Sequence, residues 1–135
     1  MGTRGYRELR AWQKAMELMM EVYRISDRFP KQELFGLTRQ LRRAALSIPA
    51  NIAEGDGREH RGDYLRHLSI ARGSVSELDT LLDAAARLSY CRGEDLRLAV
   101  ELTDHVGRML TRLIERLKGE RVGRGPRGEG RATRC

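Results

Sequence analysis

Large apolar residues recur at alternating spacings of three and four, and this pattern returns in four separate segments of the chain. The spacing follows the period of an α-helix and gathers the apolar side chains on one face. In the first segment, about residues 8–27, a seam of Leu9, Trp12, Met16, Met19 and Tyr23 runs beside a second stripe of Ala15, Leu18, Val22 and Ile25. This face is wider than one partner helix covers, so we expect burial on two sides.

The second segment follows Phe29-Pro30, which ends the first helix because the residue before a proline avoids the helical conformation. It begins near Gln32 or Glu33, and Gly55 and Gly57 end it. Its expected inward stripe is Leu34, Leu37, Leu41, Ala44, Ile48 and Ile52. Pro49 lies inside, where a proline costs about 3 kcal/mol. A restart capped by Ser47 would leave only a short, marginal helix, so we predict one helix kinked at Pro49.

The third helix is predicted from a capping Asp63 to about Tyr90, and the fourth follows the turn at residues 91–93. Short connections favour antiparallel neighbours, so the fold class is all-α: an antiparallel up-down-up-down four-helix bundle over residues 1–118. Residues 119–135 hold five Gly, five Arg and one large aliphatic residue. They bury too little apolar surface to fold, which predicts a disordered Gly/Arg-rich tail.

The chain is basic, with a net charge of +7 and a pI near 10.1. The tail contributes +3 of this charge, and a moderately basic body is compatible with a nucleic-acid partner. Arg outnumbers Lys by 23 to 3, which genomic base composition explains as readily as phosphate recognition. No apolar run approaches the roughly 20 residues of a membrane helix, and residues 1–10 lack a signal-peptide stretch. We therefore expect a cytoplasmic protein without membrane contact, and Cys91 and Cys135 as free thiols.

The histidines give little support for catalysis. His67 follows Asp63, and His105 follows Glu101, each at a spacing of four, but each pair stands alone on a polar helix face. Such pairs are more often solvated than metal-bound. His60 has no Cys or Ser nucleophile near it in the sequence. We therefore assign no catalytic, cofactor-binding or metal-binding residue, and we expect no cofactor and no enzymatic activity.

The second helix has an unusual outer face. Arg39, Arg42 and Arg43 lie there with Leu46, Ala50 and Ala53, and a solvent face is rarely this small and apolar. Beside it, a polar stripe of Arg43, Ser47, Asn51 and Glu54 continues past the proline, and Gly73, Ser74 and Glu77 lie off the main seam of the third helix.

These two polar groups have two interpretations. One is an ordinary solvated flank. The other is a buried polar network, which consists of Arg43, Ser47, Asn51, Glu54, Ser74 and Glu77. A glycine inside a helix costs about 1 kcal/mol, so its presence at Gly73 indicates that another backbone approaches closely there. We favour the network, in which Arg43 is matched by Glu54 or Glu77 since an unpaired buried charge is costly.

Several motifs carry a family resemblance. They are LRAWQ at residues 9–13, Phe29-Pro30, Glu33 with Gly36-Leu37, QLRRAALSIPANIAEGDG at residues 40–57, and Gly73-Ser74 with Glu77. Over residues 9–118 the chain resembles the four-helix-bundle family encoded by intervening sequences in bacterial 23S ribosomal RNA genes. The segment from Ser47 to Gly55 is highly specific.

The resemblance implies an antiparallel bundle assembled as a ring, a homopentamer, with no known enzymatic activity. It also implies kinship with the accessory bundle protein of diversity-generating retroelements, which is similar in fold, pentameric, and binds nucleic acid and its reverse transcriptase. The Gly/Arg tail has no counterpart in the family pattern.

The expected function is thus that of a non-catalytic, cytoplasmic homo-oligomer that binds RNA or DNA electrostatically. The expected nucleic-acid-binding residues are Arg39, Arg42 and Arg58, with the tail arginines as auxiliaries. The alternative is a protein-interaction adaptor, for example for a reverse transcriptase or another polymerase.

Overall fold

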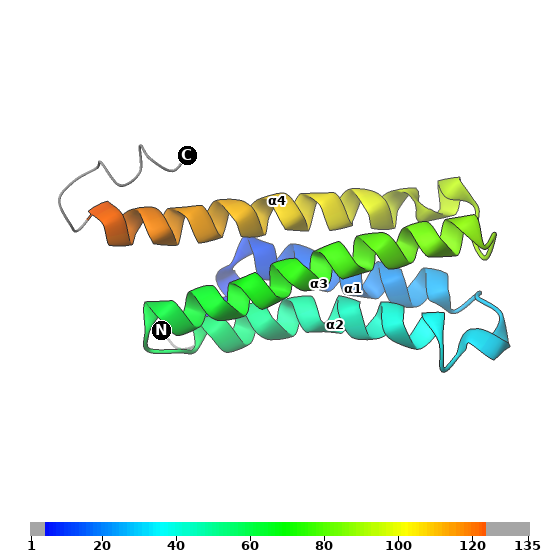
Figure 1. Cartoon of the computed structure of the whole chain (residues 1–135), viewed down its shortest axis with the longest axis horizontal. Helices are drawn as coiled ribbons and strands as arrows, with labels where there is room; N and C mark the ends of the chain where they lie inside the picture. Colours follow the sequence, from blue (N-terminus) through cyan, green and yellow to red (C-terminus); the bar gives the residue numbers. More distant parts are fainter. Residues whose placement is uncertain (1–4, 124–135) are drawn as a thin grey trace.

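The structure is a computed structural model that describes residues 5–123. A 3₁₀ turn, η1 (Gly5–Glu8), precedes helix α1 (Arg10–Ser26), and a second, η2 (Lys31–Glu33), precedes helix α2 (Leu37–Asp56). Helices α3 (Arg61–Arg87) and α4 (Gly93–Gly123) complete the fold (Figure 1). The described residues contain four α-helices and no strand, which confirms the predicted all-α class.

The four helices surround one core. α1 contacts α2 and α4, and α3 contacts α2 and α4, so each helix has two neighbours. In Figure 1 the α1–α2 and α3–α4 connections lie at one end and the α2–α3 connection lies at the other. α2 continues through the buried Pro49 as one helix and ends at Asp56, as the paired glycines predict. No helix among the described residues is long and apolar enough to cross a membrane.

The two apolar stripes of α1 differ from the prediction in which one lies at the centre of the core. The central stripe is the one predicted as secondary, with Ala15, Leu18 and Val22 fully buried. The large residues of the predicted seam, such as Trp12 and Met19, are only half-buried against the edge of the core. Small and branched side chains allow helices to approach closely, so the bulkier residues are displaced to the flank.

α2 begins at Leu37 rather than near Glu33, and Leu34 is half exposed instead of facing the core. The Glu33 carboxylate explains this boundary, because its Oε1 accepts a hydrogen bond from the Leu37 backbone N–H at 2.9 Å. A Cβ at Gly36 would lie 2.6 Å from that oxygen. Glycine therefore leaves room for the carboxylate to cap the helix.

The ends of α3 and α4 also differ from the sequence expectation. His60 is the N-cap of α3, and Asp63 lies in the first turn, where its charge favours the positive end of the helix. α3 ends at Arg87, and Ser89 has a positive φ of 61°. α4 continues through residues 119–123, past the predicted boundary at 118, because extending an established helix is easier than starting one. The rest of the predicted tail lies outside the described residues.

Candidate functional site

A chain of polar side chains joins α2 to α3. The Ser74 hydroxyl donates to the Ser47 hydroxyl at 2.9 Å. The amide of Asn51 donates to the Ser47 carbonyl at 2.9 Å and lies 3.1 Å from the Ser47 hydroxyl oxygen. Asn51 Oδ1 lies 3.0 Å from His67 Nδ1, which must donate because an amide oxygen only accepts. We call these four residues, Ser47, Asn51, His67 and Ser74, the α2–α3 polar seam.

The seam contains half of the predicted network. Ser47, Asn51 and Ser74 come together, whereas Arg43, Glu54 and Glu77 are exposed. The predicted pairing of a buried Arg43 with Glu54 or Glu77 is not formed in this chain, and Glu54 instead accepts from Arg58 at 2.5 Å. The physical reason is that short neutral groups satisfy one another at the seam, while a long charged side chain reaches water at no desolvation cost.

His67 belongs to the seam although it was expected on the solvent surface. It is 8 % exposed, and among the described atoms its buried Nε2 has no hydrogen-bond partner. The signal for its burial was present in the sequence. His67 precedes Ala71 and Ser74 at spacings of four and seven, which places all three on the face that α3 turns inward.

The close backbone approach occurs at Gly55 rather than at Gly73. A Cβ at Gly55 would lie 2.8 Å from His67 Cβ and 2.9 Å from Tyr64 Cδ1, whereas a Cβ at Gly73 has nothing within 4 Å. Gly55 therefore lets the part of α3 around Tyr64 and His67 lie directly on α2. At this contact, burial, aided by the carboxylate of Asp56, raises the pKa of Tyr64 to about 12.

A second polar link joins η2 to the end of α3. Glu33 Oε2 accepts a hydrogen bond from the Tyr90 hydroxyl at 2.6 Å, while its other oxygen caps α2. The hydrogen bond from the Tyr90 hydroxyl, and to a smaller extent the one from the Leu37 N–H, hold the pKa of Glu33 below its usual value. This gives a structural role to Glu33 and Gly36-Leu37, which stand among the family-like motifs.

The three predicted nucleic-acid contacts have different surroundings. Arg39 is exposed and has no hydrogen bond or ion pair with the described residues. Arg58 is paired with Glu54. Arg42 is half-buried, its Nε donates to Ser26 Oγ at 2.9 Å, and its guanidinium lies over the Tyr23 ring. The three residues therefore do not form one cluster of unpaired cations.

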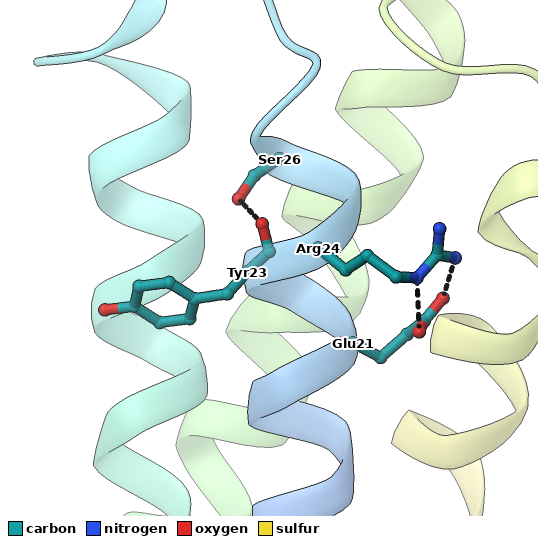
Figure 2. A network of polar contacts seen from close by, with 4 residues as sticks. All are labelled: Glu21, Tyr23, Arg24 and Ser26. Carbon is teal, nitrogen blue, oxygen red and sulfur yellow. Dashed lines mark hydrogen bonds and ion pairs between the residues drawn. The ribbon is translucent and has the colours of Figure 1, made fainter.

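Arg42 instead stabilises the end of α1. The Ser26 hydroxyl, which accepts from Arg42, donates in turn to the Tyr23 carbonyl (Figure 2). The guanidinium is therefore close to the C-terminal carbonyls of α1, where a positive charge is favoured by the helix dipole. On the other side of α1 in Figure 2, the buried Glu21 is bound by Arg24 and faces α4.

Ten cations on the described surface are exposed and have no hydrogen bond, ion pair or cation–π contact within it. They are Arg10, Arg28, Lys31, Arg39, Arg43, Arg66, Arg97, Arg112, Arg116 and Lys118. No group of three or more His, Cys, Asp or Glu side chains among the described residues could hold a metal ion. These cations give the described surface a capacity to attract anions.

Four helices packed around a single core define the class of this molecule as a four-helix-bundle protein. Residues 7–112 match the 23S rRNA-intervening sequence protein family, and the chain belongs to that family. Its fold is similar to the crystal structure of a protein of unknown function from the S23 ribosomal protein family of Bacteroides thetaiotaomicron VPI-5482. The TM-score is 0.73 at 22% identity, over 78% of this chain and 95% of that one. No curated protein matches the chain.

Proposed function

We propose that this protein is a non-catalytic, cytoplasmic homo-oligomer that binds RNA or DNA through phosphate contacts. Each subunit is an antiparallel up-down-up-down bundle with α2 kinked at Pro49, and the subunits form a ring, a homopentamer. The observation that carries the binding proposal is the set of ten exposed cations that form no hydrogen bond or ion pair with the described residues. Cations that stabilise no contact of their own are free to neutralise phosphates.

An apolar surface supports the oligomer. We call it the α1–α2 apolar flank, and it consists of Trp12, Met16, Met19, Met20, Tyr23, Leu46, Ala50 and Ala53. Met20 is 65% exposed and Leu46 is 45% exposed. The Tyr23 side chain points toward α2 in Figure 2, so α1 and α2 contribute to the same side. A contiguous apolar patch of this kind is typical of a subunit interface.

The experiment that tests this function combines mass and binding. Light scattering coupled to size exclusion is expected to give a closed oligomer, and the same fraction is expected to bind a mixed-sequence oligonucleotide at low salt. A monomer at micromolar concentration would exclude the ring. An oligomer that leaves the oligonucleotide free at low salt would exclude nucleic-acid binding.

The second candidate function is that of a protein-interaction adaptor for a reverse transcriptase or another polymerase. Phe35 and Leu34, in the connection between α1 and α2, favour this candidate because they are 81% and 50% exposed. Neighbouring exposed apolar residues in a loop suit contact with another protein. Retention of a polymerase at high salt, lost in Phe35→Ser, would support the adaptor.

A further inference from the structure

Two surface hollows on the described part of the bundle differ in charge. The first lies between α3 and α4, where Arg72, Arg108 and Arg112 are balanced by three acids, Asp79, Glu101 and Asp104. Arg108 pairs with Asp104, and Arg72 donates to Thr111. Two of the three arginines in this hollow are therefore already engaged within the chain, while the third, Arg112, also lines the second hollow.

The second hollow lies between the start of α1 and the C-terminal half of α4 and has a volume of about 700 Å³. We call it the α1–α4 hollow. Arg10, Arg112 and Arg116 line it, with Glu115 as the one acid of the lining. Each of the three arginines is exposed and forms no ion pair or hydrogen bond with the residues that the structure describes. This hollow therefore concentrates uncompensated positive charge.

The start of α1 adds to this potential. The first turn of α1 contains no acidic residue, and its N-cap, Leu9, has no side chain that could accept a backbone hydrogen bond. The positive end of the helix dipole therefore lies beside Arg10, with no acidic residue in that first turn. Further along the α4-facing side of α1, Glu21 and Arg24 form an ion pair that adds no net charge (Figure 2).

The α1–α4 hollow lies on a different side of α1 from the apolar flank. In Figure 2 the Tyr23 side chain points toward α2, while Glu21 and Arg24 lie on the side of α4. Arg10 precedes Glu21 by about three helical turns and so shares its side of α1. The flank and the hollow are therefore on different sides of the same helix, so burying the flank does not by itself cover the hollow.

We propose that the α1–α4 hollow binds the phosphate groups of a nucleic-acid backbone, an assignment that rests on the nucleic-acid binding proposed above. Each guanidinium presents a planar fork of donors that matches phosphate oxygens, and the apolar floor of Leu9, Met109 and Leu113 displays no competing acceptor side chain. No aromatic residue lines the hollow, so bases cannot stack there. Recognition at this site is by charge and is independent of base sequence.

The test uses the triple variant Arg10→Gln/Arg112→Gln/Arg116→Gln in the full chain. A fluorescent single-stranded RNA of mixed sequence is titrated at several salt concentrations. Loss of three phosphate contacts should flatten the slope of log K against log salt by about 2. The affinity ratio between wild type and variant should then shrink about 16-fold between about 50 and 200 mM salt. The matched control is Arg87→Gln/Arg92→Gln/Arg108→Gln, which removes the same charge from exposed arginines that already form ion pairs within the chain.

The control is expected to keep most of the wild-type slope. An equal loss of slope in the two triple variants would show that only the net charge matters. This result would overturn the assignment of the α1–α4 hollow but not the proposal that the protein binds nucleic acid. Absence of binding by the wild type would overturn the proposed function and the site together. Circular dichroism checks folding, and Arg112→Lys/Arg116→Lys, which keeps the charge, should retain the slope and lose affinity.

The same three arginines could instead bind a free anion such as inorganic phosphate, and a competition experiment distinguishes the two ligands. At matched ionic strength, inorganic phosphate in place of chloride is expected to leave RNA binding unchanged. Displacement of the RNA from the wild type but not from the triple variant, at low phosphate concentration, would assign the hollow to a small anion and overturn the backbone proposal.

Discussion

Two glycines of the bundle should respond oppositely to the same substitution. At Gly55 a new methyl group would lie 2.8 Å from His67 Cβ and 2.9 Å from Tyr64 Cδ1. Favourable carbon contacts begin near about 3.5 Å, so α2 and α3 would have to separate by about 0.7 Å. Overpacking of this kind costs about 1–3 kcal/mol, against which a helix gains about 1 kcal/mol when alanine replaces glycine. We expect Gly55→Ala to lower the free energy of unfolding by about 1 kcal/mol.

Gly73→Ala is the matched control. A Cβ at Gly73 meets no atom within 4 Å, so only the helix-propensity gain remains, and we expect about 0.5–1 kcal/mol of added stability. Urea unfolding at one fixed protein concentration measures both variants, because the stability of an oligomer depends on concentration. If Gly55→Ala is as stable as Gly73→Ala, the close approach of α3 to Gly55 does not constrain the fold, and the reasoning fails.

Three further variants test the polar links and the flank. Asn51→Ala should lower stability by about 1–3 kcal/mol by leaving the buried His67 Nδ1 unpaired, whereas the exposed Gln40→Ala should change little in the same unfolding assay. The pKa of Glu33 is lower in the folded state than in the unfolded state. The ionised carboxylate therefore contributes to the free energy of unfolding above the unfolded-state pKa, and this contribution is lost as the pH falls through the folded-state pKa. Glu33→Gln should therefore be less stable than wild type near about pH 6 and approach it as the pH falls below the folded pKa of Glu33, while Glu77→Gln matches wild type throughout; a gap that persists in strong acid would contradict this. Leu46→Asp should reduce the oligomer mass in light scattering, and Leu98→Asp, on α4 with similar exposure, should not; unchanged mass in both would remove the flank from the interface.

Helix number and approximate helix position could be predicted from the sequence because they depend on periodicity. The alternation of threes and fours in α3, for example, identifies Leu68, Ala71 and Leu82 as inward residues, and all three are buried. The glycines after Glu54 likewise predict the end of α2. Both features depend only on neighbours along the chain.

The corrections depend on distances between helices, which a single helical wheel does not contain. The two apolar stripes of α1 are equivalent on a helical wheel. Only the packing against α2 and α4 determines that the stripe with the smaller side chains lies at the centre of the core. Gly55 and Gly73 are alike in sequence but differ in whether another helix is adjacent. Arg42 looks free on α2 until Ser26 and Tyr23 of α1 are placed beside it.

The salt dependence of nucleic-acid binding tests the central claim most directly. Anisotropy of a labelled, mixed-sequence RNA or DNA is measured with the wild-type oligomer at several salt concentrations. We expect binding at low salt and a linear fall of log K with log salt, with a slope of about −0.7 to −0.9 for each phosphate neutralised. No binding at low salt, or an affinity that salt leaves unchanged, would contradict it.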